Sequence, residues 1–101
     1  MARGEYKTPG GKLIAVEFAV ADGRLRDVMV TGDFFLYPEE ALEDLMACLE
    51  GMPVELTEAA IADRVRPALP PGTELLGSSP EAIAIAVQRG LVASGVAANG
   101  Q

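Results

Sequence analysis

Two short segments carry the residue types best suited to contacting a ligand or a partner protein. The first is Gly32-Asp33-Phe34-Phe35, in which a carboxylate and two adjacent aromatic rings follow a glycine. Two of the chain's three phenylalanines lie there. At the end of a strand, such a pair can bury one ring in the core and offer the other to a partner. An interface role for this segment therefore depends on whether one of the two rings is exposed.

The second segment is Pro9-Gly10-Gly11-Lys12. Its two glycines allow the backbone to turn tightly, and Lys12 would present an ammonium group to a phosphate or carboxylate on another protein. The alternative is a turn that leads into a strand and carries a solvated lysine. Asp33 has a similar alternative, since its side chain can bond the backbone of the turn into the next helix instead of positioning a ligand. Both alternatives stay open from the sequence.

The residue types that most enzymes need are scarce in this chain. There is no histidine and one cysteine, Cys48, so neither a usual zinc site nor a Ser-His-Asp or Cys-His nucleophile is expected. Neither GxxxxGK[ST] nor GxGxxG occurs, which gives no support to a nucleotide-binding loop. We expect no catalytic residue here, no metal ligand, and a Cys48 that is buried as a small hydrophobic residue.

Composition indicates one folded domain over residues 1–101, ordered from about 4 to 93, with a flexible tail at 94–101. Half of the residues are hydrophobic, yet no apolar run approaches the roughly 20 residues that span a bilayer, so no membrane association is expected. The N-terminus lacks the apolar stretch of a signal peptide. Together with the single cysteine, this favours a cytoplasmic location.

The net charge of −7 argues against nucleic acid as a partner, and the charge is distributed unevenly. Residues 1–32 hold five bases and four acids, whereas residues 33–63 hold nine acids and no base. The simpler interpretation is a solvated acidic helix face. The alternative is a bipolar surface whose near-neutral hairpin docks on an anionic or mixed partner.

The elements that would position these segments are strands first and helices afterwards. Alternation over residues 12–20 predicts a strand whose buried side carries Ile14, Val16, Phe18 and Val20. An Asp-Gly turn leads to a return strand over residues 25–31, in which a bulge near Arg26-Asp27 would bring Leu25 into phase with Val28. A third strand at residues 4–8 is a further candidate.

Helical spacing predicts three helices after the hairpin. The first would begin with Pro38 at its first position and carry an apolar stripe of Leu42, Leu45, Met46 and Leu49 up to Gly51. Thr57 would cap the second, and Ser78 or Ser79 the third, with Ser78 and Glu81 at the spacing of a capping box. Strands followed by helices, without alternation, predict an α+β fold with a small antiparallel sheet and about three helices on one face.

With these elements in place, the chain from about residue 5 to 93 resembles the C-terminal accessory domain of lipoate–protein ligases. The resemblance rests on Pro9-Gly10-Gly11-Lys12-Leu13, on Arg26-Asp27-Val28 leading to Thr31-Gly32-Asp33-Phe34-Phe35, and on two later segments. These are the acidic stretch that begins at Pro38 and Gly77-Ser78-Ser79-Pro80-Glu81. A difference is Leu36, where fused domains of the Gram-positive type tend to have glycine.

The resemblance implies a non-catalytic subunit of an ATP-dependent ligase, in the form in which the accessory domain is a separate polypeptide. The catalytic large subunit would bind lipoate, ATP and Mg, form lipoyl-AMP and transfer the lipoyl group to a lysine of a carrier domain. This chain would enable the adenylation step by docking as one half of a heterodimer. Its candidate partner-facing or adenylate-facing residues are Gly10, Gly11, Lys12, Gly32, Asp33, Phe34 and Phe35.

A different class of function also fits the sequence. A small regulatory α+β domain that binds a metabolite and self-associates through its sheet edge would form a homo-oligomer and gain stability from its ligand alone.

Overall fold

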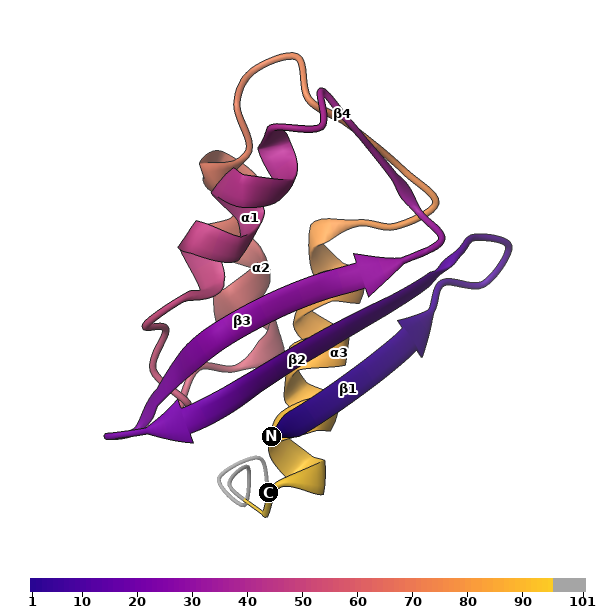
Figure 1. Ribbon diagram of the computed structural model, residues 1–101. Coiled ribbons are helices and arrows are strands. Elements are labelled where there is room, and N and C mark those ends of the chain that lie inside the picture. Colours follow the sequence, from indigo (N-terminus) through magenta and orange to yellow (C-terminus); the bar gives the residue numbers. More distant parts are fainter. Residues whose placement is uncertain (96–101) are drawn as a thin grey trace.

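The computed structural model describes residues 1–95 as a three-stranded sheet, a separate two-stranded ribbon and three helices (Figure 1). The strands are β1 (Ala2–Lys7), β2 (Leu13–Ala21), β3 (Arg24–Gly32), β4 (Phe35–Tyr37) and β5 (Glu74–Leu76). The helices are α1 (Ala41–Leu49), α2 (Glu58–Ala68) and α3 (Pro80–Ala93). The predicted α+β class is confirmed.

The main sheet is antiparallel with the order β1-β2-β3, and the helices lie on one of its faces (Figure 1). The strand expected at residues 4–8 is β1, which pairs with β2 from Ala2 opposite Phe18 to Lys7 opposite Leu13. α3 packs mainly against β1, while α1 packs against β3 and against α2. The outer face of the sheet carries mostly charged and small side chains, with Met29 exposed among them.

The β2–β3 hairpin has the turn and the bulge that the sequence predicts. Asp22 and Gly23 both take positive φ, at 56° and 71°, as a tight hairpin turn requires. The register then shifts from Glu17 opposite Met29 to Ala19 opposite Arg26. Asp27, with φ of 55°, occupies this bulge. The extra residue brings Leu25 and Val28 to the same buried side, which a regular strand could not do.

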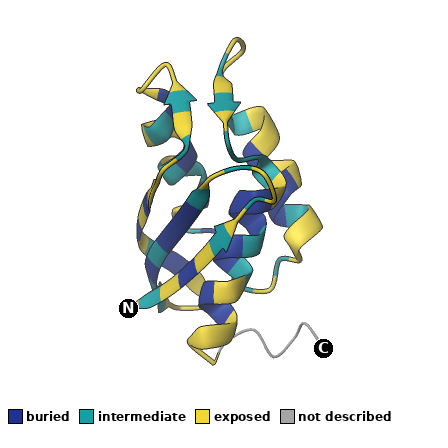
Figure 2. Ribbon diagram, turned by 90° about the vertical axis from the view of Figure 1, so that its right-hand side faces the viewer, coloured by how far each residue is buried: buried dark blue, intermediate teal, exposed yellow. Residues whose placement is uncertain are grey.

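The core lies between the sheet and the helices (Figure 2). Its fully buried large side chains come from β2, β3 and all three helices: Ile14, Val16, Phe18, Leu25, Leu45, Leu49, Ile61, Val65, Ile83, Val87 and Leu91. Leu42, Met46 and Val20 lie at its edge, half-buried. The apolar stripes predicted from helical spacing therefore face this core.

The first helix begins later than predicted. Pro38 does not occupy its first position, because Pro38 to Glu40 form a turn in which the Ala41 amide donates to the Pro38 carbonyl at 3.0 Å. The chain is extended up to Tyr37, which pairs with β5. The residues after it are closed by i→i+3 bonds, as in a 3₁₀ turn, before the α-helical pattern begins. α1 ends at Leu49, and Gly51 follows with φ of +78°.

The caps of the other two helices follow side-chain chemistry. Thr57 accepts a hydrogen bond from the Ala60 amide, as predicted. Ser79 caps α3 by accepting from the Ala82 amide at 3.0 Å, so a capping box built on Ser78 is wrong. Glu81 instead forms an ion pair with Arg66 on α2. The two helices are thus tied at their exposed ends.

The predicted tail at residues 94–101 falls largely on residues 96–101, which lie outside the described residues. Within residues 1–95 no helix has the length and apolarity to cross a bilayer.

Candidate functional site

The two segments singled out in the sequence meet at one end of the sheet. The Asp33 amide donates to the Leu13 carbonyl at 3.0 Å, which ties the Gly32-Asp33-Phe34-Phe35 segment to the residue after Lys12. The Lys12 amide donates to the Gly77 carbonyl at 2.9 Å, which adds the end of β5 to the same place. Three segments far apart in sequence therefore form one surface, and two of them carry the predicted site residues.

Lys12 lies at the exposed edge of this surface. Its side-chain stem runs beside Gly77, where an added Cβ would lie 2.6 Å from Lys12 Cγ. The ion pairs recorded among residues 1–95 involve only arginine as the cation, so the Lys12 ammonium has no carboxylate partner there. It is therefore free to approach an external anion.

The Asp33 side chain is exposed, and Asp33 stabilises the turn through its backbone amide. The amide bonds Leu13, whereas no hydrogen bond of the Asp33 carboxylate occurs within the described part of the chain. α1 begins only at Ala41, too far along the chain for Asp33 to cap it. The carboxylate consequently adds negative charge to the surface without a structural bond of its own.

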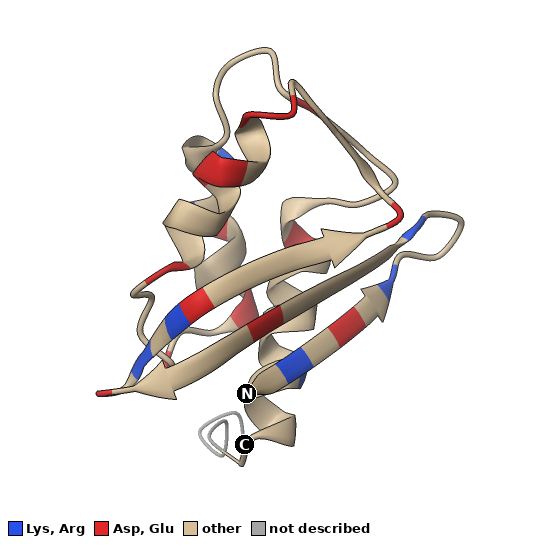
Figure 3. Ribbon diagram, in the orientation of Figure 1, with Lys and Arg blue, Asp and Glu red and all other residues tan. Residues whose placement is uncertain are grey.

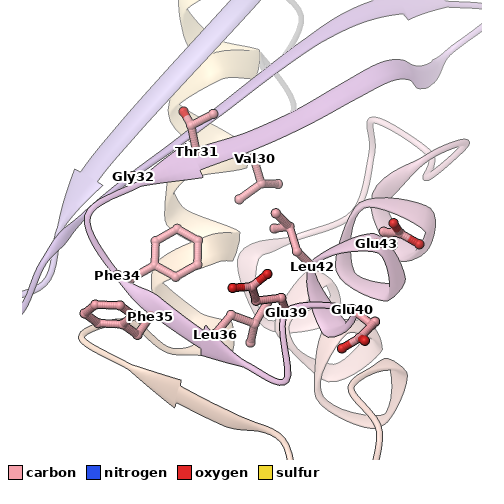
Figure 4. A pocket seen from close by; sticks show the side chains of 10 residues that line it. All are labelled: Val30, Thr31, Gly32, Phe34, Phe35, Leu36, Glu39, Glu40, Leu42 and Glu43. Carbon is pink, nitrogen blue, oxygen red and sulfur yellow. The ribbon is translucent and has the colours of Figure 1, made fainter.

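Phe34 and Phe35 point to different environments. Phe34 is half-buried and packs against the core, whereas Phe35 is 72% exposed. In Figure 4 the two rings lie next to each other at the start of β4. An interface role for this segment required one exposed ring, and Phe35 provides it.

The exposed ring belongs to a larger apolar surface that the sequence did not reveal. We call β4 and β5 together the ribbon. Its register places Phe35 opposite Leu76 and Leu36 opposite Leu75. Leu36 and Leu75 pack on the core, while Phe35, Tyr37 and Leu76 are 72%, 67% and 57% exposed on the other side. The only signal in the sequence was the run of three large hydrophobic residues Phe35-Leu36-Tyr37, which is too short to indicate a strand by itself.

A pocket of about 520 Å³ adjoins the ribbon, between the end of β3, β4 and the start of α1 (Figure 4). Val30, Phe34, Leu36 and Leu42 form the apolar part of its walls. Glu39, Glu40 and Glu43 complete its lining, and in Figure 4 Glu39 extends between Phe34 and Leu42. The pocket therefore combines an apolar interior with negative charge.

Acidic residues dominate this end of the molecule. In Figure 3 acidic residues occur along α1 and the turn before it, while the basic residues lie mainly on the sheet. The absence of any base between residues 33 and 63 means that the pocket's charge is not neutralised by its own neighbours in sequence. This side of the chain favours a cationic contact.

The single cysteine, Cys48, is not poised to react as a thiolate. Cys48 lies half-buried on α1, its thiol 3.4 Å from the Arg64 carbonyl oxygen. Burial raises the pKa of the Cys48 thiol, which keeps the reactive thiolate scarce at neutral pH. In the described residues no group of three or more histidine, cysteine or acidic side chains could hold a metal ion.

No protein-family model and no curated protein matches the sequence of this chain. A solved structure is similar, with a TM-score of 0.69 and 26% sequence identity over 86% of this chain and 94% of that chain. It comes from an archaeal lipoylation system, described as a bipartite lipoate protein ligase and its E2 lipoyl domain from Thermoplasma acidophilum. The two chains share a related fold. Because the alignment takes in most of both, the similarity concerns the arrangement of the whole domain.

Proposed function

We propose that this chain is the non-catalytic accessory subunit of a two-chain lipoate–protein ligase. It docks on the catalytic subunit and enables ATP-dependent formation of lipoyl-AMP, before the lipoyl group passes to a lysine of a carrier domain. The observation that carries the proposal is the similarity along most of both chains to a component of a bipartite lipoylation system. The meeting of the Gly10-Gly11-Lys12 and Gly32-Asp33-Phe34-Phe35 segments at one surface adds to it.

The contribution of such a subunit is positional. In this arrangement lipoate, ATP and Mg are bound by the catalytic subunit. Docking a folded domain beside the reaction centre orders the loops that contact the adenylate and excludes water. Both effects raise the rate of adenylation without a chemical group from this chain.

The first experiment measures lipoyl-AMP formation by the catalytic chain from the same organism, with and without this chain. We expect stoichiometric addition to raise the rate by at least about tenfold, which corresponds to roughly 1.4 kcal/mol of barrier. The intact mass of this chain should stay unchanged, because it is not the carrier. An unchanged rate, or lipoylation of Lys7 or Lys12, the two lysines in the sequence, would contradict the proposal.

Lys12 offers a sharper test within the site. We expect Lys12→Ala to lower stimulated adenylation about tenfold and to leave transfer from preformed lipoyl-AMP nearly unchanged. A hydrogen bond to a charged group contributes roughly 1.5–3 kcal/mol, enough for this effect if the ammonium contacts an anion during adenylation.

Lys7→Ala is the matched control, since Lys7 is also exposed but lies on β1, opposite Leu13. Equal losses in both half-reactions with Lys12→Ala would indicate weakened docking and remove the specific role of Lys12.

A further inference from the structure

The outer side of the ribbon gathers three of the six large hydrophobic side chains that are exposed in the described residues. Phe35, Tyr37 and Leu76 share one face because Tyr37 is two residues from Phe35 and Leu76 lies directly opposite Phe35. The other three are not part of this cluster: Met1 precedes β1, Met29 lies on β3 and Val92 lies on α3. An exposed cluster with two aromatic rings is typical of an interaction surface.

The ribbon is held in place by its inner side. Two strands of three residues would not be stable alone, so the ribbon depends on Leu36 and Leu75, which pack against the core. Its end is fixed to the sheet by the bond between Lys12 and Gly77. The exposed rings are thus presented on an ordered platform, which limits the entropy lost when a partner binds.

The charges around the ribbon indicate the chemistry of its occupant. Glu74 lies on the same outer face, opposite Tyr37, and the acidic pocket lies beside Phe35. A second copy of this chain would bring the same carboxylates face to face, because a two-fold contact pairs each patch with itself. A partner with apolar residues surrounded by lysine or arginine is complementary.

The pocket can accept a basic side chain of such a partner. The aliphatic stem would contact Val30, Phe34 and Leu42, and the cationic head would reach Glu39. The ring of Phe34 adds a favourable cation–π contact. Phe35 both lines the pocket and belongs to the exposed face, so the two features form one continuous surface.

We propose that the outer face of the ribbon and the adjoining acidic pocket form the surface by which this chain binds the catalytic subunit, through an apolar segment of that subunit bordered by basic side chains. This inference rests on the proposed function. It places the main contact on the acidic half of the molecule, at Phe35, Tyr37 and Leu76. The near-neutral hairpin is then not the main docking surface.

The test measures affinity for the purified catalytic chain by isothermal titration calorimetry, at low and at high salt. Phe35→Ala, Tyr37→Ala and Leu76→Ala should each weaken binding, with at least about a tenfold rise in Kd for the two aromatic residues. Val92→Ala is the matched control, because Val92 is 65% exposed on α3. Glu39→Gln should weaken binding and reduce its dependence on salt, whereas Asp22→Asn, in the hairpin turn, should not.

All of these side chains are exposed, and thermal melting checks that each variant is folded. Wild-type binding that the ribbon variants leave unchanged would overturn the inference while the proposed function stands. A wild-type chain that does not bind the catalytic chain at all would overturn both. If the ribbon variants abolish only self-association, the surface serves a second copy and the inference is wrong.

Discussion

Gly4→Ala is expected to lower the free energy of unfolding of this chain by a large part of its total. A Cβ on Gly4 would lie 1.8 Å from the Ala86 carbonyl oxygen and 2.4 Å from the Gly90 amide nitrogen, both in α3. These atoms belong to the helix backbone, so no side-chain rotation can relieve the contact. β1 would have to leave either α3 or β2, and we expect a loss of about 3 kcal/mol or more. For a domain of this size the melting temperature should fall by roughly 15 °C.

Gly90 makes the same close approach from the other side. Its own added Cβ would lie 2.9 Å from two ring atoms of Phe18 and 3.1 Å from the Gly4 nitrogen. Two glycines facing each other thus allow the strand backbone to lie directly on the helix backbone. This explains why β1 packs so closely on α3 although every second side chain of β1 is exposed.

Gly72→Ala is the control for Gly4→Ala, measured by the same thermal melt. It adds the same methyl group where nothing lies within 4 Å, so only its positive φ of +84° adds strain, about 1 kcal/mol. If both variants melt within a few degrees of each other, the close contact between β1 and α3 does not form in solution.

Gly32→Ala is expected to damage both stability and the site. Gly32 has φ of +150°, and its Cβ would lie 2.2 Å from the Leu13 carbonyl oxygen and 3.0 Å from Phe34 Cδ1. The same Leu13 carbonyl accepts the Asp33 amide, so the substitution would separate the two site segments. We expect a loss of about 3 kcal/mol from backbone strain and overpacking together, measured by urea unfolding.

The second readout is stimulated adenylation, measured well below the melting temperature of the variant. Displacement of Asp33 to Phe35 should lower it at least about tenfold even when the chain is folded, since a misplacement of about 1 Å caused by a change far from the reacting atoms can cost about 100-fold in rate. Gly23→Ala is the control, because Gly23 also has positive φ but lies in open space, in the turn between β2 and β3. Full stimulation by folded Gly32→Ala would mean that the alignment of the two segments is not needed.

Much of the fold was readable because the signals are local. Alternation placed Ile14, Val16 and Phe18 on the buried side of β2, and the phase change between Leu25 and Val28 indicated the bulge at Asp27. Thr57 identified the start of α2 through its side chain. Each of these features depends on residues a few positions apart, where spacing and backbone preference suffice.

The ribbon was missed because its pairing is not local. Phe35–Tyr37 and Glu74–Leu76 are three residues each, too short to show a period, and α1 and α2 separate them in the chain. The ribbon is positioned by the burial of Leu36 and Leu75 against the core, which joins parts of the chain that are far apart in sequence.

The sequence by itself determined the class of the fold and the acidic character of one half, since these follow from composition and period. It also marked Lys12 and Phe35 as residues worth attention. Only the tertiary structure decided that their segments meet, that Phe34 packs inward while Phe35 faces out, and that Tyr37 and Leu76 join it. Adjacent side chains on a strand point to opposite faces, and the packing of the ribbon on the core determines which face is covered.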